Sequence, residues 1–333
     1  MTKLLEVKNL TTNFHIGVGI VQAVRNVSFH LDQGDSLGIV GESGSGKSVT
    51  MLSVMGLLPE YAEIRADAIR FNGADMLDLD AATFRKIRGG EIGMIFQDPM
   101  TSLNPLYTVE NQLIEPLRIH RGLGKAEARR TALELLRRVD IPNPEQRLKQ
   151  YPHEFSGGMR QRVMIAMAVA CQPKLVIADE PTTALDVTIQ AQVLDLLTHL
   201  KNETNTSVIM ITHDLGVIAS MCRRILVMYG GVLCEQGTAR EIFYEPRHPY
   251  TWGLLHSIPK ITGNTGEKLI PINGTPPDML RPPKGCPFAP RCPHAMPVCR
   301  KYLAPDTVLS DTHIAACHLM HPSAPKVERQ VRA

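Results

Sequence analysis

Long apolar runs are missing from this sequence of 333 residues. The longest clean run, residues 163–170, is far shorter than the roughly 20 residues that a helix needs to cross a bilayer. Near the first residue, Glu6 and Asn9 interrupt the apolar stretch that a secretory signal peptide requires. The sequence therefore predicts a chain that has no membrane-spanning helix and stays in the cytoplasm.

The sequence also has no block of like charges, and its number of cysteines is odd. The net charge is only +3, and the basic residues form no consecutive block, so nucleic acid is not the expected partner. Seven cysteines, an odd number, argue against a disulfide scaffold and favour thiols or metal ligands. Residues 246–333 contain 15 of the 24 prolines, which excludes long regular elements there.

Short apolar runs alternate with helical patterns before this proline-rich part. Residues 36–40 predict a strand that leads into a glycine-rich loop, and residues 47–58 follow with a helix-compatible pattern. Residues 175–178 and 208–211 are continuous apolar runs, which are typical of strands buried on both faces of a parallel sheet. Polar residues follow both runs, so we expect functional groups at the carboxyl ends of the strands.

Three further patterns complete the expected architecture. Residues 4–10 and 21–31 predict a small antiparallel section, and residues 225–235 predict a hairpin about Gly230 and Gly231. Between residues 98 and 155 one apolar helix face is formed by Ala128, Ala132, Leu135, Leu136 and Val139. Together these patterns predict an α/β fold with a mixed sheet core, an N-terminal antiparallel β section, a helical subdomain and a C-terminal extension rich in proline and cysteine.

The glycine-rich loop has the sequence Gly41-Glu42-Ser43-Gly44-Ser45-Gly46-Lys47-Ser48, which matches G-x-x-x-x-G-K-[ST]. In this P-loop motif, backbone N–H groups surround phosphate oxygens, Lys47 supplies a positive charge and the Ser48 hydroxyl can ligate Mg²⁺. A second segment, Ser156-Gly157-Gly158-Met159, offers a hydroxyl and unhindered amides at a helix start, which also suits phosphate. The sequence thus contains two candidate half-sites for a nucleotide.

With Asp179-Glu180, Asp186 and His213 in addition, the order and spacing of these motifs resemble those of the ATP-binding cassette (ABC) ATPases. A P-loop alone would leave adenylate kinases, GTPases and helicases open. The family signature reads Leu-Ser-Gly-Gly-Gln, and Phe155 and Met159 replace its outer residues here. The resemblance implies a P-loop NTPase cassette over residues 1–240, with the helical subdomain inserted at about residues 98–160.

The resemblance also implies a role for each motif residue. Ser48, Gln97 and Asp179 would hold Mg²⁺ directly or through water. Glu180 would act as general base on the attacking water, and Gln97 would touch the metal and this water. Lys47 would hold the β- and γ-phosphates, and His213 would reach the γ-phosphate. The nucleotide-binding residues that it implies are Phe14, Gly41, Ser43, Gly44, Ser45, Gly46, Lys47, Ser48, Ser156, Gly157, Gly158 and Asp186.

Four of these residues have plainer alternative interpretations. Gln97 could be a surface loop glutamine, and His213 could cap a helix or end a strand. Phe14 could be an ordinary packing aromatic. Asp186 could cap the helix that begins at residue 187, either instead of or in addition to its family role at a subunit interface.

In ABC ATPases the Ser156 segment of one subunit completes the P-loop site of the other, so that ATP joins two cassettes head to tail. The resemblance therefore implies a second homologous ATPase subunit, a paralogue in preference to an identical chain. It also implies two integral membrane permease subunits and, indirectly, an external substrate-binding protein. The expected location is the cytoplasmic face of the plasma membrane of a bacterial type of cell.

Residues 241–333 resemble the C-terminal extension of dipeptide and oligopeptide permease ATPases. The segment that carries this resemblance is Arg247-His248-Pro249-Tyr250-Thr251. Outside the extension, residues 97–105 resemble the loop with which ATPases of this group contact their membrane subunits. The resemblance implies ATP-driven uptake of dipeptides and oligopeptides, although nickel and glutathione importers share these features. A non-transport ABC ATPase is less compatible, because the chain has neither paired cassettes nor a coiled-coil insertion. A binding or redox-sensing protein with a degenerate cassette is disfavoured because Lys47, Glu180 and His213 are intact.

Four of the seven cysteines lie in the extension with the spacing C-x5-C-x6-C-x17-C. Four thiolates can close a tetrahedral zinc site or hold a four-iron, four-sulfur cluster. The resemblance implies a [4Fe–4S] cluster on Cys286, Cys292, Cys299 and Cys317. Zn²⁺ is the less favoured alternative, because the C-x2-4-C pairs usual for structural zinc are absent. The remaining donors are expected to face solvent (His294, His318) or to be buried filler (Cys171, Cys222, Cys234).

Overall fold

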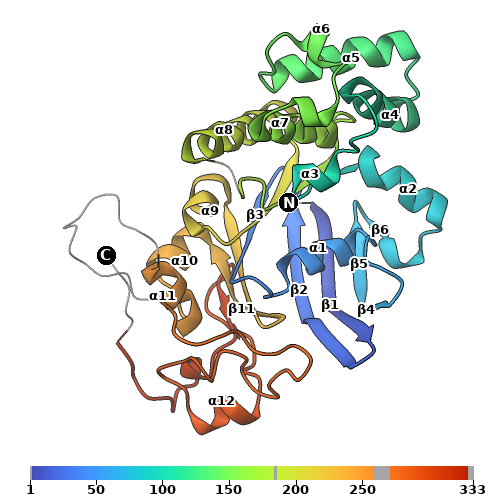
Figure 1. Ribbon diagram of the computed structural model, residues 1–333. Coiled ribbons are helices and arrows are strands. Elements are labelled where there is room, and N and C mark those ends of the chain that lie inside the picture. Colours follow the sequence, from blue (N-terminus) through green and yellow to red (C-terminus); the bar gives the residue numbers. More distant parts are fainter. Residues whose placement is uncertain (1, 184–185, 258–270, 329–333) are drawn as a thin grey trace. The chain divides into compact units, whose positions relative to one another are not determined.

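The structure is a computed structural model that describes residues 2–183, 186–257 and 271–328 (Figure 1). The chain forms two compact units. One, here called the P-loop unit, consists of Lys3–Leu31, Ser36–Asp75 and Ile211–Ala333. The other, here called the helical unit, consists of Met1–Thr2, Asp32–Asp35 and Met76–Met210.

The P-loop unit contains the antiparallel section that the sequence predicts. Its strands are ordered β2-β1-β5-β6, and β4 pairs with β1. The two main strands are longer than expected, because their pairing continues to a turn at Gly17 and Val18. The bounds are Lys3–Ile16 for β1, Gly19–Asp32 for β2, Ala62–Arg65 for β4, Ala68–Phe71 for β5 and Ala74–Asp75 for β6.

A mixed set of strands in the same unit positions the P-loop. Strand β3 (Ser36–Val40) is buried at all five residues and runs parallel to β10 (Arg224–Tyr229). The predicted hairpin joins β10 to β11 (Val232–Thr238), and positive φ angles at Gly230 and Gly231 form its two-residue turn. The extension adds β13 (Ile314–Ala315) and β12 (Thr307–Val308) beside β11, which the sequence does not predict.

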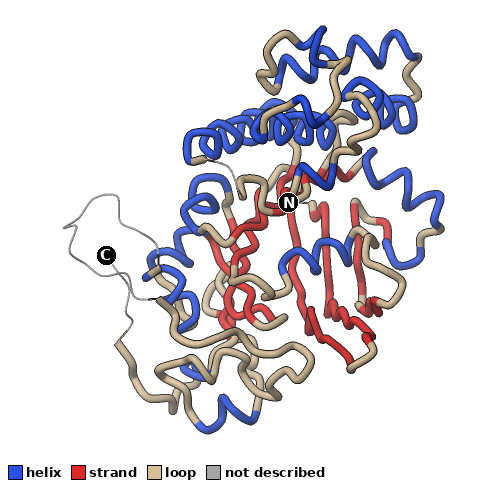
Figure 2. The backbone as a smooth tube through the Cα atoms, in the orientation of Figure 1, coloured by secondary structure: helices blue, strands red, loops and turns tan. Residues whose placement is uncertain are grey.

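The helices of this unit are short. Helix α1 (Lys47–Val54) ends before the expected residue 58, because Gly56 takes a positive φ. In Figure 2 the described part of the extension is mostly loop, as its proline content predicts. The other helical elements are α9 (Leu215–Met221), α10 (Ala239–Tyr244), α11 (Pro249–His256), α12 (Pro297–Lys301) and the 3-10 turn η3 (His318–Met320).

The helical unit contains parallel strands and the predicted helical insertion. Strands β7 (Ile92–Ile95) and β8 (Leu175–Asp179) are parallel, and β9 (Ser207–Thr212) begins in this unit beside β8. The predicted face of α5, from Ala128 to Leu136, is buried, which confirms the helix. The helical elements are η1 (Met76–Asp78), α2 (Ala81–Gly90), α3 (Pro99–Ser102), α4 (Val109–Arg121), α5 (Lys125–Arg138), α6 (Pro144–Arg147), η2 (Pro152–Glu154), α7 (Gly157–Val169) and α8 (Val187–Thr204).

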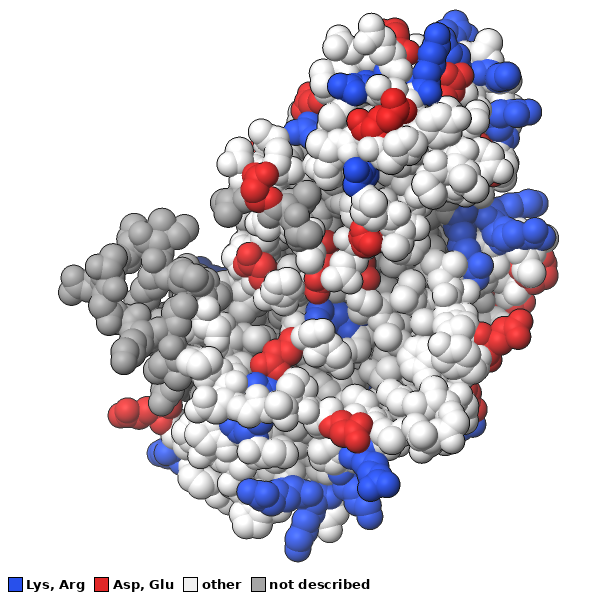
Figure 3. Space-filling view, in the orientation of Figure 1, with Lys and Arg blue, Asp and Glu red and all other residues white. Residues whose placement is uncertain are grey.

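Surface charge is mixed, and one basic area belongs to the extension. Figure 3 shows Lys and Arg side chains gathered at the lower edge, over the extension. The exposed basic residues of the extension include Arg281, Lys284, Arg300 and Lys301. In the part of the chain that the structure describes, no helix combines the length and apolarity needed to cross a membrane.

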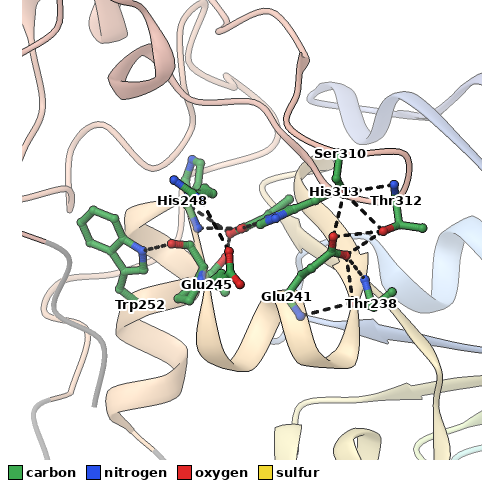
Figure 4. Close-up of polar contacts among 12 residues, drawn as sticks. Thr238, Glu241, Glu245, His248, Trp252, Ser310, Thr312 and His313 are labelled. Carbon is green, nitrogen blue, oxygen red and sulfur yellow. Dashed lines mark hydrogen bonds and ion pairs between the residues drawn. The ribbon is translucent and has the colours of Figure 1, made fainter. Parts of the chain in front are cut away.

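Two glutamates, Glu235 in β11 and Glu241 in α10, hold the extension. Figure 4 labels Glu241 and the residues around it. Glu235 is 1% exposed and accepts hydrogen bonds from the Arg247 and His248 amides at 2.6 and 2.9 Å and from Thr251 Oγ1 at 2.6 Å. It also lies 2.7 Å from His313 Nε2. One buried carboxylate thus joins the segment before α11 to the loop that carries His313.

Replacement of Glu235 by alanine is expected to lower the free energy of unfolding by about 3–5 kcal/mol, because it leaves buried donors without their acceptor. Urea denaturation followed by circular dichroism measures the change. Glu245→Ala is the matched control, because the Glu245 side chain is 58% exposed and its ion pair with Arg247 contributes little. Equal losses in the two variants would contradict the role given to Glu235.

Glu241 forms a second anchor, in a capping box with Thr238. Burial alone would raise the pKa of Glu241, but hydrogen bonds from Ser310, Thr238 and Thr312 lower it from its ordinary value of 4.5 to about 2. These hydrogen bonds favour the ionised form of Glu241. The contribution of Glu241 to the free energy of unfolding is therefore complete above pH 4.5 and is lost as the pH falls toward 2.

We therefore expect the difference in unfolding free energy between the parent and Glu241→Gln to shrink as the pH falls from 4.5 to 2. Urea denaturation at several pH values in this window measures the difference. A difference that stays constant over the window would show that the Glu241 charge does not hold the loop around Ser310 and Thr312.

Candidate nucleotide-binding site

The P-loop connects β3 to α1, as the sequence predicts. Its conformation requires glycine at two positions, because φ is 154° at Gly41 and 100° at Gly46. A Cβ atom would lie 2.2 Å from the Met228 carbonyl oxygen at Gly41 and 2.5 Å from the Ala23 carbonyl oxygen at Gly46. At Gly44, which also has a positive φ, a Cβ would meet no described atom within 4 Å. The loop is therefore closely packed at its base and open at Gly44.

The charge and the donors of the loop suit an anion. Lys47 is 5% exposed, and its Nζ donates to the carbonyl oxygens of Gly41 at 2.8 Å and Glu42 at 3.0 Å. Helix α1 starts at Lys47 with no side-chain cap and no acidic residue in its first turn, which leaves its N-terminal N–H groups suited to phosphate. Within the described residues, the buried Ser45 Oγ has no hydrogen-bond partner. Ser43 is exposed and Ser48 is half-buried.

Phe14 and His213 also lie in the P-loop unit. Phe14, in β1, is half-buried, and its ring centroid lies 6.0 Å from that of Tyr61. His213 follows β9 directly and is exposed. Asp214, and not His213, caps α9 by accepting from the Gly216 and Val217 amides, so the capping interpretation of His213 is wrong. Adenine stacking by Phe14 and γ-phosphate contact by His213 stay predictions.

In the helical unit, the structure brings Gln97 and Glu180 together. Asp179 ends the buried strand β8, and Glu180 follows it with a φ of 45°, an unusual conformation for a residue other than glycine. Glu180 Oε2 accepts hydrogen bonds from Gln97 Nε2 at 3.0 Å and Thr183 Oγ1 at 2.8 Å. Gln97 is thus exposed, but its side chain is hydrogen-bonded and helps to orient the Glu180 carboxylate.

Two glutamines that the sequence analysis missed support the segment after Glu180. Gln161, in α7 and 2% exposed, donates to the Pro181 carbonyl at 2.7 Å. Gln190, in α8, donates to the Thr182 carbonyl at 3.1 Å. Gln161 stands between Arg160 and Arg162 in the sequence, so no local pattern distinguished it from a surface residue. These bonds fix the backbone that carries the Glu180 carboxylate.

Ser156 caps α7, because its Oγ accepts from the Met159 amide at 3.3 Å. A Cβ atom at Gly157 would meet no described atom within 4 Å, whereas one at Gly158 would lie 3.0 Å from Ile189 Cγ2. Gly157 therefore leaves the helix start open, and Gly158 lets α7 pack closely against α8. Phe155, which departs from the family signature, is 3% exposed and fills an apolar position.

Asp186 caps α8 by accepting from the Ile189 amide at 2.9 Å, which confirms the capping interpretation. The neighbouring Ala184 and Leu185 lie outside the described residues. An additional role for Asp186 at a subunit interface stays a prediction.

The four cysteines of the extension line one pocket, although they are up to 31 positions apart in the sequence. Burial raises the pKa of the Cys292 thiol to about 11 and that of the Cys317 thiol to about 12. The neighbouring thiols of Cys286 and Cys299 add to both shifts. Among residues 2–183, 186–257 and 271–328, no three His, Cys, Asp or Glu side chains are placed to hold a metal ion.

Several expectations about the other donors need correction. His294 and His318 are half-buried and line the same pocket, instead of facing solvent, because His294 packs against Trp252 and His318 lies 3.1 Å from the Tyr302 carbonyl. Cys222 and Cys234 are buried, as predicted. Cys171 is only half-buried, with its Sγ 3.5 Å from the Pro116 carbonyl oxygen.

Comparison with known proteins identifies the family. The family described as "ABC transporter" matches residues 24–183, and the family "Oligopeptide/dipeptide transporter, C-terminal region" matches residues 234–299. Among solved structures, the ATP-binding cassette MJ0796, in a dimeric post-hydrolysis state bound to ADP and Pi, superimposes with a TM-score of 0.63 at 31% identity. The match covers 71% of this chain and 99% of that one, which confirms the predicted α/β P-loop cassette.

Two relatives match almost the whole chain. The "Oligopeptide transport ATP-binding protein OppD" of Bacillus subtilis (strain 168) is 54% identical over 329 residues, which cover 98% of this chain and 92% of the relative. The "Dipeptide transport ATP-binding protein DppD" of Lactococcus lactis subsp. cremoris (strain MG1363) is 52% identical over 326 residues, 98% of this chain and 93% of the relative. The chain therefore belongs to the ABC transporter family, among the ATP-binding proteins of oligopeptide and dipeptide transport.

Proposed function

We propose that this chain is the ATP-hydrolysing subunit of an importer for dipeptides and oligopeptides. The observation that carries the proposal is the placement of Glu180 directly after β8, with its carboxylate held by Gln97 and Thr183. The names of the relatives and the matched C-terminal region support peptides in preference to nickel or glutathione. We further propose that residues 1–240 form the cassette, with residues 98–160 inserted, and residues 241–333 the extension.

The P-loop would bind the triphosphate through the amides of residues 44–48 and the charge of Lys47. The open Gly44, the unpartnered Ser45 hydroxyl and the uncapped start of α1 fit such a ligand. Ser48, Gln97 and Asp179 would hold Mg²⁺, which neutralises the charge that develops on the phosphates. Glu180 would accept a proton from the attacking water, and His213 would contact the γ-phosphate.

A second cassette would complete the site through its own copy of the Ser156 segment. The exposed, capped start of α7 with an open Gly157 supports this role, and so does the dimeric state named for the MJ0796 structure. We propose a paralogous partner cassette, two integral membrane permease subunits and, indirectly, a substrate-binding protein. The assembly would place this chain at the cytoplasmic face of the plasma membrane.

The loop after Gln97 has the properties expected for contact with the permease subunits. Large side chains in this loop and directly after it are exposed: Met100 at 59%, Leu106 at 80% and Tyr107 at 53%. Exposed apolar groups that lie close together in the sequence favour a protein interface over free solvent.

We also propose that Cys286, Cys292, Cys299 and Cys317 hold a [4Fe–4S] cluster that staples the extension. The set of four thiols around one pocket supports this site, because thiolates are the usual ligands of such clusters. A single zinc ion requires all four sulfur atoms to lie about 2.3 Å from one metal atom. A four-iron cluster binds each sulfur at a different iron atom, so its four cysteines lie farther apart. Iron and zinc assays after anaerobic purification test the proposal, and stoichiometric zinc without iron would overturn it.

The transport function is tested by purification from gently solubilised membranes, followed by reconstitution in vesicles with the subunits retained. We expect two integral membrane proteins and a second cassette to be retained, and peptide uptake to require ATP. Retention of none of them, or uptake of nickel but not of peptides, would contradict the proposed function.

A further inference from the structure

Glu42, the second residue of the P-loop, is held by the C-terminal extension. Its backbone N–H donates to Tyr250 Oη at 2.7 Å. Its carboxylate accepts from both terminal nitrogens of Arg291, at 2.5 and 3.0 Å, and its carbonyl oxygen accepts from Lys47 Nζ. All polar groups of Glu42 are therefore engaged, and residues of the extension supply the partners of its amide and its carboxylate.

Arg291 and Tyr250 are themselves rigidly placed. The Arg291 side chain is 6% exposed and donates to Tyr229 Oη at 2.9 Å and to the Ile272 and Asn273 carbonyl oxygens, also at 2.9 Å. Tyr250 is fully buried, with its ring centroid 4.5 Å from that of Tyr229 and 5.3 Å from that of Phe288. Such a site differs from a surface ion pair, whose long side chains must be ordered before they can interact.

The charge of Glu42 explains why the pairing matters for a nucleotide. A carboxylate in a loop that receives a triphosphate repels its ligand unless a cation compensates it. The bidentate guanidinium of Arg291 compensates this charge from the side of the extension, and the Tyr250 hydroxyl fixes the Glu42 amide.

We propose that Arg291 and Tyr250 are positioning residues for ATP binding, through which the extension holds the P-loop and neutralises Glu42. This inference rests on the proposed function, because it presupposes that the loop binds ATP. It gives the extension a part in nucleotide affinity.

The test is calorimetric titration of the full chain with MgATP, with Glu180→Gln in every variant to prevent turnover. We expect Arg291→Met to raise the Kd about 10-fold or more, because it leaves the Glu42 carboxylate of the P-loop without its compensating cation. Adding Glu42→Gln to Arg291→Met should return the Kd to within about threefold of the parent, since the repulsive charge is then gone. Tyr250→Phe should raise the Kd by a smaller factor, about threefold.

Arg281→Met, at an exposed arginine of the same extension, is the matched control and should leave the Kd unchanged. An Arg291→Met protein that binds MgATP like the parent, while Lys47→Ala binds about 100-fold more weakly, would overturn the inference and leave the proposed function intact. A double variant as weak as Arg291→Met would overturn the charge argument, because only packing would then be at work. A parent that binds no MgATP would overturn the proposed function and this inference together.

Discussion

Replacement of Glu180 by glutamine is expected to slow ATP turnover by about 10²–10⁴-fold, the range that a positioned general base contributes. A glutamine side chain has nearly the same shape, and its carbonyl oxygen can still accept from Gln97 Nε2 and Thr183 Oγ1. The geometry should therefore survive, and the affinity for MgATP should stay within about threefold of the parent. Only the capacity to take a proton from water is lost.

Release of inorganic phosphate in the assembled transporter measures this effect, and nucleotide titration measures the affinity. Glu134→Gln, at an exposed position of α5, is the matched control and should turn over like the parent. Turnover by Glu180→Gln close to the parent rate would remove Glu180 from the role of base.

Replacement of Lys47 by alanine is expected to raise the Kd for MgATP about 100-fold, which corresponds to about 3 kcal/mol. Lys47 is the one cation of the P-loop sequence, and hydrogen bonds between charged groups contribute about 1.5–3 kcal/mol each. The change also removes the donor that the Gly41 and Glu42 carbonyl oxygens share.

Calorimetric titration again measures the Kd. Lys8→Ala controls for the loss of a positive charge elsewhere in the same unit, because the Lys8 side chain is 51% exposed. If both variants lost affinity equally, net charge and not the P-loop would govern binding.

The parts of the fold that were predictable from the sequence are those whose signal lies within a few consecutive residues. Strands β3, β8 and β9 are buried at every residue and appear as continuous apolar runs. The turn at Gly230 and Gly231 has the residues that its positive φ angles require. By contrast, β12 and β13 have two residues each, too few for any periodic pattern to show.

The site was predictable where chemistry depends on a contiguous motif. The P-loop, Asp179 with Glu180, the helix start at Ser156 and the capping role of Asp186 all follow from neighbouring residues. The bonds from Glu42 to Tyr250 and Arg291 do not, because the partners are 208 and 249 positions apart. The same holds for Gln161, whose amide reaches a carbonyl 20 positions away.

Phe155 shows how the structure explains a departure from the family signature. The usual leucine and this phenylalanine both fill a buried apolar position, so the exchange preserves burial while the polar cap at Ser156 is unchanged. Only the packing around the residue could establish this equivalence.

The central claim is that ATP is bound between two cassettes, each of which supplies a half-site. The most direct test is the mass, by light scattering, of the Glu180→Gln chain mixed with the second cassette of its transporter. We predict a one-to-one complex in MgATP that dissociates without nucleotide and that does not form when Ser156→Arg blocks the α7 half-site. Parental ATP turnover by a lone monomer, or a complex indifferent to both ATP and Ser156→Arg, would contradict the account.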